Sequence, residues 1–272
     1  MKSSLRFILG SAVLALAIPP ASLLALSDTE ASAGRALGKR FADAVVGVEL
    51  IATIKLSIGG HAAPPREVRL DANGTVISAD GLTVTSLIEI DPRRTAEAAT
   101  RNLTLASGQR VQIGATEFRD VRLLLADGSE IAAKIVRTDA ARDLAFLVPV
   151  ADPAAAKRAY TWVKLADAAP PAILGSYFVV SRASKSLQRV PEVHASTIEG
   201  IVETPQSFFI PDGFVTGCPM LDLQGRVLGL CLTQMVDGHP MLVGGHPSGI
   251  ILPAAEVAAE AVLATAPTTA KL

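Results

Sequence analysis

Cysteine and aromatic residues are scarce in this sequence of 272 residues. It holds two cysteines and one tryptophan, and aromatic side chains make up 4% of the total. Two cysteines cannot build the dense disulfide framework on which small secreted domains depend. An excess of positive charge is also lacking, since 25 Lys and Arg face 26 Asp and Glu. Binding to nucleic acid or to an anionic membrane surface normally needs such an excess, so we expect neither as a partner.

Apolar side chains, in contrast, make up half of the sequence, and charged side chains 19%. This balance is unlike that of a disordered chain, which has few apolar residues and a high net charge. A chain of this length holds enough apolar material for one large β domain or two small ones.

The N-terminus has the pattern of a targeting segment. Lys2 and Arg6 give it a basic start, and residues 7–18 form an apolar run that is too short for a comfortable membrane span. We therefore predict a signal peptide over residues 1–33 and export to the periplasm or the extracellular space. The alternative is an uncleaved N-terminal anchor, which would be the only contact with a membrane.

The end of this segment offers more than one cleavage site. Ala31-Ser32-Ala33 has the Ala-x-Ala form that signal peptidases cut, and Ala25 or Ser27 would also serve. Cleavage after Ala33 would leave a domain over residues 34–265 and a short tail over residues 266–272.

A helix is predicted at each end of this domain. Small and apolar residues recur at helical spacing over Ser32–Val45, with Asp28 or Ser32 as the cap, and an Ala-rich helix follows over Ala254–Ala264. The least patterned stretch, Asp91–Glu117, is predicted to be a surface insertion.

Between the helices the sequence indicates many short strands. The first covers Val46–Ile58, where β-branched residues alternate with others. Further runs are Gly74–Ala79, Leu82–Ile90, Val121–Leu125, Ile131–Val136, Leu144–Val150, Tyr177–Val180, Ile198–Val202, Pro219–Leu223, Val227–Leu232 and Ser248–Leu252. Turn pairs such as Asp80-Gly81 and Asp127-Gly128 separate them, which is typical of an all-β sandwich or barrel.

Three segments resemble a known family, the Deg/HtrA-type trypsin-like serine proteases. Gly74–Ile88 resembles the strand, turn and strand that end in Thr-x-x-His, which presents the general base. Val121–Val136 followed by Asp143-Leu-Ala-Phe-Leu resembles the next hairpin, whose Asp-(Ile/Leu)-Ala-Leu motif carries the acid. Phe214-Val-Thr-Gly-Cys-Pro-Met220 stands where the family has Gly-(Asp/Asn)-Ser-Gly-Gly-(Pro/Ala)-Leu. The resemblance covers roughly Phe41–Val257 and implies a trypsin-like double six-stranded β-barrel, with two Greek-key barrels and short helices at both ends.

The resemblance does not extend to the catalytic residues of the family. Matching the motifs puts Ile88 at the histidine position, Asp143 at the aspartate position and Thr216 at the serine position. The mechanism needs a group that removes the hydroxyl proton and returns it to the leaving amine, and an Ile side chain can do neither. His61 lies in a turn ahead of the strand that should deliver the base. Glu89 neighbours Ile88, but adjacent strand residues point to opposite faces.

The nucleophile and the oxyanion loop are changed as well. Thr216 keeps a hydroxyl, but its methyl group restricts the rotamer and crowds an approaching substrate. Phe214 replaces the glycine that supplies one oxyanion N–H, and only Gly217 retains the glycine of that loop. Removing the serine or histidine from such a triad costs about 10⁶ in turnover, or about 8 kcal/mol of barrier. Asp143 is then expected to be a structural residue, hydrogen-bonded by backbone or hydroxyl groups.

The two cysteines carry a geometric prediction. If Gln224-Gly225 is a two-residue hairpin turn, Leu223 pairs with Arg226, and Cys218 faces Cys231 across two antiparallel strands. This pair would be either a disulfide or two buried thiols. No third ligand follows at a metal-binding spacing and no Gly-rich phosphate loop matches, so neither a metal nor a cofactor is expected.

Together these patterns predict an exported, catalytically inactive trypsin-like protease homologue, a pseudoprotease that binds a peptide or protein in the cleft between its barrels. The first alternative is a divergent, active serine-type endopeptidase that uses Thr216, Ser207 or Ser248 as its nucleophile. The second is an unrelated exported all-β protein whose strand order is similar to that of the family.

Overall fold

The computed structural model describes residues 26–93, 97, 111–151, 158–244 and 246–266. The chain begins with helix α1 (Asp28–Phe41) and the 3₁₀ helix η1 (Ala42–Ala44). Ser27 and Glu30 form a capping box, in which each side chain accepts a hydrogen bond from the backbone N–H of the other residue. The Ser176 hydroxyl also donates to Glu30, and hydrogen bonds from Ser176 and Ser27 lower the pKa of Glu30 to about 2. No helix in these ranges is long and apolar enough to cross a membrane.

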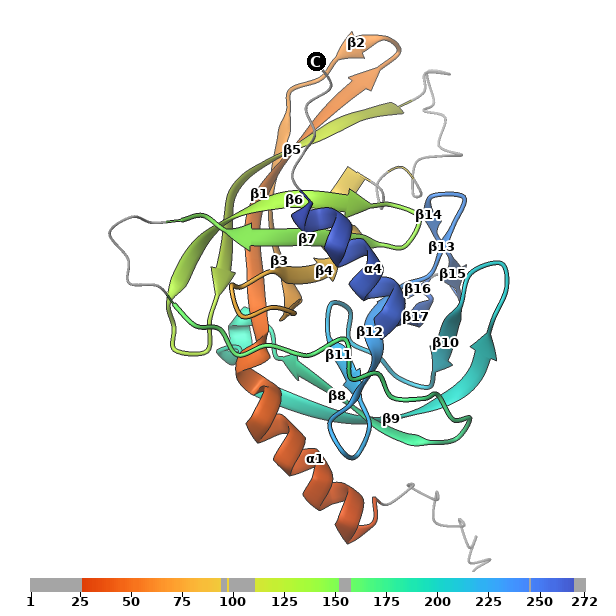
Figure 1. Cartoon of the computed structure of the whole chain (residues 1–272). Helices are drawn as coiled ribbons and strands as arrows, with labels where there is room; N and C mark the ends of the chain where they lie inside the picture. The colour runs from red at the N-terminus through yellow and green to blue at the C-terminus, as the bar shows by residue number, and fades with distance from the viewer. Residues whose placement is uncertain (1–25, 94–96, 98–110, 152–157, 245, 267–272) are drawn as a thin grey trace, which may run out of the picture.

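The first barrel closes from six antiparallel strands in the order β1-β3-β4-β7-β6-β5, with β5 pairing back onto β1 (Figure 1). These strands are β1 (Val45–Ile58), β3 (Arg66–Val76), β4 (Thr83–Ser86), β5 (Val111–Leu124), β6 (Glu130–Asp139) and β7 (Leu144–Pro149). The short strand β2 (His61–Ala62) pairs with the end of β1, and the one-turn helix α2 (Leu87–Ile90) follows β4.

The second barrel closes in the order β10-β17-β12-β11-β8-β9. Its strands are β8 (Ser176–Arg182), β9 (Pro191–Val202), β10 (Phe208–Pro211), β11 (Pro219–Leu221), β12 (Val227–Thr233) and β17 (Gly249–Pro253). Between β12 and β17 lie two small hairpins, formed by β13 (Met235–Val236), β14 (His239–Pro240), β15 (Leu242–Val243) and β16 (His246–Pro247). Helix α4 (Ala254–Thr265) closes the described chain.

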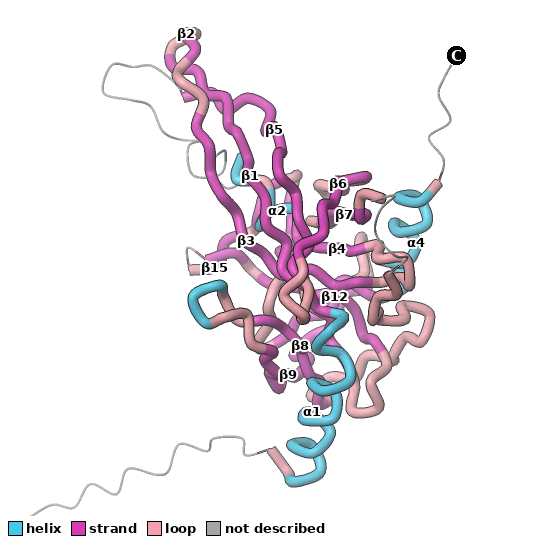
Figure 2. Tube along the Cα trace, turned by 90° about the vertical axis from the view of Figure 1, so that its left-hand side faces the viewer, coloured by secondary structure: helices cyan, strands magenta, loops and turns pink. Residues whose placement is uncertain are grey.

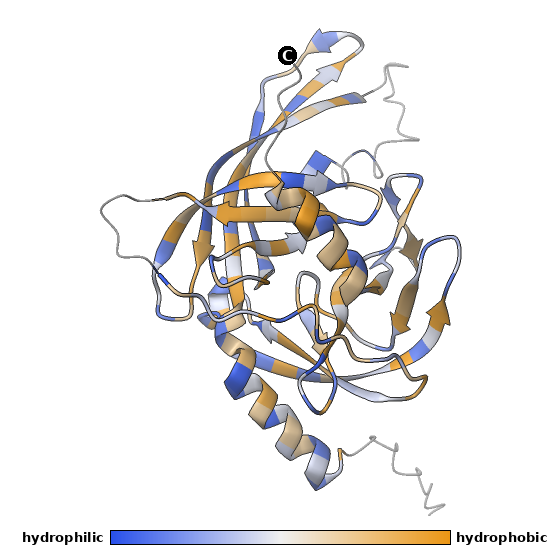
Figure 3. Cartoon of the chain, in the orientation of Figure 1, coloured by the Kyte–Doolittle hydropathy of each residue, from blue (hydrophilic) through white to orange (hydrophobic). Residues whose placement is uncertain are grey.

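Three strands extend beyond the closed part of the first barrel. Figures 1 and 2 show β1, β3 and β5 projecting together as an arm that ends at β2. The arm forms because β1 stays paired with β3 as far as Ile54 and with β5 as far as Ile58, whereas β4 and β6 pair only near the base. Figure 3 shows polar and apolar residues mixed along this arm, and apolar residues gathered on the strands of the barrels.

Apolar side chains of both barrels meet in a shared core. Val84 and Phe146 of the first barrel belong to the same buried cluster as Leu230 and Leu252 of the second and Val257 of α4. Burying such a side chain is worth roughly 1.5–3 kcal/mol relative to leaving it exposed, so this shared core favours contact between the barrels.

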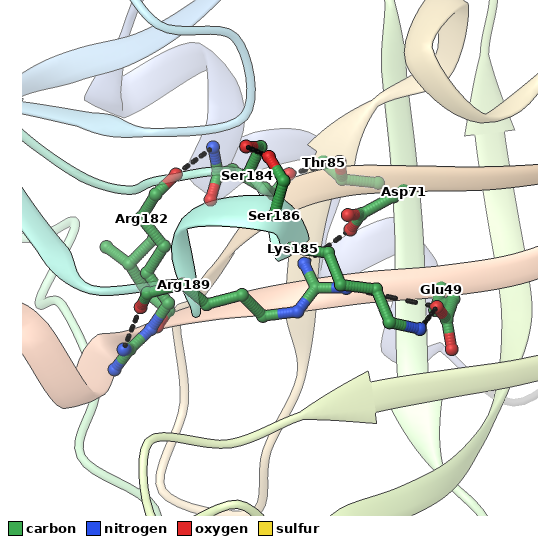
Figure 4. Close-up of polar contacts among 10 residues, drawn as sticks. Glu49, Asp71, Thr85, Arg182, Ser184, Lys185, Ser186 and Arg189 are labelled. Carbon is green, nitrogen blue, oxygen red and sulfur yellow. Dashed lines mark hydrogen bonds and ion pairs between the residues drawn. The ribbon is translucent and has the colours of Figure 1, made fainter.

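Hydrogen bonds between polar side chains also join the two barrels at the base of β1 (Figure 4). The donors lie in and beside the loop that contains the 3₁₀ helix η2 (Lys185–Leu187), between β8 and β9. Lys185 donates to Glu49 at 2.7 Å, and Arg189 donates to Asp71 at 2.5 Å. Arg182 is buried and donates to the carbonyl oxygens of residues 42, 45 and 189, which links both barrels to the end of α1.

The structure confirms the all-β double barrel with a helix at each end and corrects several boundaries. The first helix begins at Asp28 because Ser27, and neither Asp28 nor Ser32, supplies its cap. Within the predicted insertion Asp91–Glu117, the residues from Val111 onward belong to strand β5. The stretches 1–25, 94–96, 98–110 and 267–272 lie outside the described residues, so most of the predicted signal peptide and tail does as well.

Candidate functional site

Asp143 lies at the junction of the two barrels with 0% of its surface exposed. Its carboxylate accepts hydrogen bonds from the Ser86 hydroxyl at 2.6 Å, the Ile88 N–H at 2.7 Å and the Thr233 N–H at 2.8 Å. Ser86 and Ile88 belong to the first barrel and Thr233 to the second, so this one side chain connects the two. Burial raises the pKa of Asp143 from its usual 3.8 to about 6, although the three hydrogen bonds oppose the rise.

Ile88 is buried directly beside Asp143. Its N–H is bound to the Asp143 carboxylate, and the N–H of Leu87 donates to the Asp143 carbonyl oxygen at 3.0 Å. These two bonds take the backbone of residues 87–90 out of the strand pairing and into a single helical turn. The predicted strand Leu82–Ile90 therefore ends at Ser86, where β4 ends.

This helical turn changes the orientation of Glu89. The Thr216 hydroxyl donates a hydrogen bond to the Glu89 carboxylate at 3.1 Å, so Glu89 faces the second barrel. The expectation that Glu89 points away from the site is therefore wrong, because it assumed a strand. Glu89 is exposed and Thr216 half-buried, so this hydroxyl–carboxylate pair is accessible to solvent. Sequence reasoning missed the pair, since the composition of the segment favours a strand.

The predicted oxyanion loop is shaped by its glycine and its aromatic residue. Gly217 has φ +76°, and a Cβ there would lie 2.1 Å from the carbonyl oxygen of Asn73 in the first barrel. Phe214 keeps a negative φ, so its backbone does not adopt the angles that favour glycine. Its ring covers Gly249, where a Cβ would come within 2.0 Å of the ring carbons, and 37% of the residue stays exposed.

The structure thus brings Ile88, Asp143 and Thr216 to one place, linked through Glu89. The other candidate residues lie elsewhere in the described chain: His61 in β2 on the arm, Ser207 just before β10, and Ser248 between β16 and β17. Among the described residues, none of these three is hydrogen-bonded to Asp143 or Thr216.

The two cysteines face each other, as their sequence positions predicted. The N–H of Cys231 donates to the Cys218 carbonyl at 2.9 Å. The neighbouring pair, on the side of the turn between β11 and β12, is Pro219 with Leu230. Both are free thiols buried in the core of the second barrel. Burial raises the pKa of Cys231 to about 12 and raises that of Cys218 as well, which disfavours the thiolate form of both cysteines.

The junction lies apart from two cavities of the molecule. Two cavities, of about 160 and about 60 Å³, are lined by neither Ile88, Asp143 nor Thr216. In the part of the chain that the structure describes, no three His, Cys, Asp or Glu side chains gather to hold a metal ion. The arrangement can therefore hold a ligand by hydrogen bonds and surface contact.

Comparisons with known proteins agree with this fold. The family profile described as the trypsin-like peptidase domain matches residues 72–230, more than half of the chain. The crystal structure of Deg5 is similar, with a TM-score of 0.55 and 19% identity over 88% of this chain and 97% of that one. The apo MamO protease domain from Magnetospirillum magneticum has a TM-score of 0.48 and 16% identity over 81% and 97%. No curated protein matches the sequence. The chain therefore belongs to the family of trypsin-like peptidase domains.

Proposed function

We propose that this chain is an exported trypsin-like protease homologue without peptidase activity, which binds a peptide or protein segment at the junction of its barrels. The observation that carries the proposal is the surroundings of the Asp143 carboxylate. Its carboxylate accepts hydrogen bonds from Ser86, Ile88 and Thr233, and the side chain beside it is the apolar Ile88. The family's histidine position therefore holds no proton acceptor.

An extended segment suits this junction better than a compact small molecule. Neither described cavity lies there, and the groups that face solvent are a carboxylate, a hydroxyl and part of an aromatic ring, on Glu89, Thr216 and Phe214. Such a surface offers a peptide one charged contact, one hydrogen-bonding group and one apolar contact. A peptide that adds a strand to a sheet edge gains further main-chain hydrogen bonds.

Two measurements on the same purified protein test the proposal. An array of short peptides should show sequence-dependent binding, and Glu89→Gln together with Phe214→Ala should weaken it. Fluorogenic peptide substrates should not be cleaved above the background of a buffer control. Cleavage that disappears in Thr216→Ala would overturn the claim of inactivity, and the lack of any peptide binding would overturn the binding role.

One observation favours a second candidate, a divergent endopeptidase. The hydrogen bond from Thr216 to Glu89 has the geometry of a nucleophile and its general base. Against this, Phe214 keeps a negative φ, and the Thr methyl group crowds the attack. A fluorophosphonate probe separates the two: this candidate requires labelling at Thr216 that Glu89→Gln abolishes, whereas a binding module stays unlabelled.

Export is the second part of the proposal, and the N-terminus of α1 indicates where the leader ends. Cleavage after Ala33 would remove Ser27 and Glu30, and with them the capping box and the bond to Ser176. Loss of an N-cap alone costs about 1 kcal/mol. We therefore favour cleavage after Ala25. Mass spectrometry of the exported protein should find Leu26 at its N-terminus, and a mature chain that begins at Gly34 would contradict this.

A further inference from the structure

A cavity of about 160 Å³ lies away from the site just described, where three segments meet. Arg40 and Phe41 come from the end of α1, Trp162 and Lys164 from the connection between the barrels, and Gly225 from the turn between β11 and β12. An engineered protein cavity of about 150 Å³ is known to bind benzene, so this space has room for about one six-membered ring.

Aromatic rings and cations together line this cavity. The Arg40 guanidinium lies 4.6 Å from the centre of the Phe41 ring, and the Lys164 ammonium lies 5.8 Å from the centre of the Trp162 ring. Both distances are within the range of cation–π attraction. Such contacts hold a cation beside a ring without neutralising its charge.

Neither cation forms an ion pair with a carboxylate of the described residues. Asp167 also lines the cavity, which leaves the lining with a net charge of one positive unit from Arg40, Lys164 and Asp167. An anionic ligand would thus meet a favourable charge, and Asp167 would accept a hydrogen bond from a ligand donor.

Gly225 lets Arg40 reach this position. Its φ is +80°, and a Cβ there would lie 3.0 Å from the Arg40 guanidinium and 3.1 Å from the Phe41 ring. The turn therefore packs closely on the end of α1, and both form one wall of the cavity.

We propose that this cavity binds a small aromatic carboxylate, with the ring between Trp162 and Phe41 and the carboxylate on Arg40 and Lys164. The ring of the ligand fits the volume of the cavity. Its carboxylate supplies the negatively charged partner that Arg40 and Lys164 do not have among the described residues. Because Trp162 packs against the core of the first barrel and Phe41 lies in the core of the second, the ligand contacts both barrels.

The test uses the full chain and benzoate as the probe. Trp162 is the only tryptophan, so its fluorescence reports on this cavity alone. Benzoate should change the emission in a saturable titration, and benzamide, the neutral analogue, should bind about tenfold more weakly because it forms no charge-assisted hydrogen bonds. Cyclohexanecarboxylate keeps the charge without the aromatic ring and should also bind more weakly.

Variants of the lining residues test whether benzoate binds in this cavity. Arg40→Gln and Lys164→Gln should each weaken benzoate binding about tenfold. Arg158→Gln removes the same charge from an arginine outside the lining and should leave binding unchanged. No saturable signal, equal binding of benzamide, or unchanged binding in both cavity variants would overturn the proposal.

Discussion

Two carboxylates at the barrel junction neighbour Ile88, yet their surroundings are opposite. Asp143 accepts a hydrogen bond from the Ile88 N–H, and Glu89 follows Ile88 in the sequence. Asp143 is fully buried and accepts hydrogen bonds from both barrels, whereas Glu89 is exposed and accepts one bond, from Thr216. Asp143, at the family's aspartate position, is therefore hydrogen-bonded to both barrels. Glu89, which is at no such position, is the group that a ligand can reach.

The difference separates a buried side of the junction from an exposed side. The buried side contains Asp143 and Gly217, both packed or bonded across the two barrels. The exposed side contains Glu89, Thr216 and Phe214. If the chain is a binding module, substitutions on the buried side should affect stability, and those on the exposed side should affect ligands.

The largest effect is expected at Gly217. Gly217→Ala places a Cβ 2.1 Å from a backbone carbonyl and forces an L residue to φ +76°, so it should destabilise the fold by about 4 kcal/mol in urea unfolding. Gly128→Ala is the matched control, because Gly128 has φ +82° with open space around it and should lose only about 1 kcal/mol. Equal losses would mean that the contact with Asn73 does not matter.

Asp143 comes next. Asp143→Ala leaves the buried N–H groups of Ile88 and Thr233 without their acceptor, so we expect a loss of about 3 kcal/mol in the free energy of unfolding. The comparison with Glu89→Ala, measured in the same way, separates a structural carboxylate from an exposed one. A loss below about 1 kcal/mol for Asp143→Ala would contradict its structural role.

The pKa of Asp143 also makes stability depend on pH. Because folding raises this pKa from 3.8 to about 6, the native state binds more protons between these values, and stability falls as pH rises through the folded pKa. The wild type should lose about 1 kcal/mol between pH 5 and pH 7 relative to Asp143→Asn, which cannot titrate. A wild type that gains stability relative to Asp143→Asn over this interval would show that the pKa is lowered.

Most of the strands and turns could be predicted from the sequence because their signals are local, although β10 (Phe208–Pro211) was missed. Asp80-Gly81 and Asp127-Gly128 were predicted as turns, and Gly81 and Gly128 indeed have φ of +93° and +82°. Glycine is favoured at such angles wherever the turn lies in the fold. The triad-position residues could be named for a similar reason, since their motifs span only a few neighbouring residues.

The orientation of Glu89 could not be predicted from its own segment. The chain leaves β4 at Ser86 because Asp143, which is distant in sequence, binds the N–H groups of Leu87 and Ile88. The facing cysteines were predicted despite an error in the turn. Leu221 pairs with Val227 across a bulge, so the loop is longer than two residues, and the bulge restores the register by Pro219.

The smallest effect on stability is expected on the exposed side. Thr216→Val removes the hydroxyl and keeps the shape of the side chain, and Glu89→Gln removes the charge and keeps a hydrogen-bond acceptor. Each should change the free energy of unfolding by less than about 0.5 kcal/mol, since one partly exposed hydrogen bond contributes little. If either variant instead loses as much as Asp143→Ala, the Thr216–Glu89 bond is also part of the framework, and the exposed side has only Phe214 left to select a ligand. If both variants keep the stability of the wild type and lose peptide binding, the two sides of the junction have separate roles, because the residues that hold the barrels together are then not those that bind.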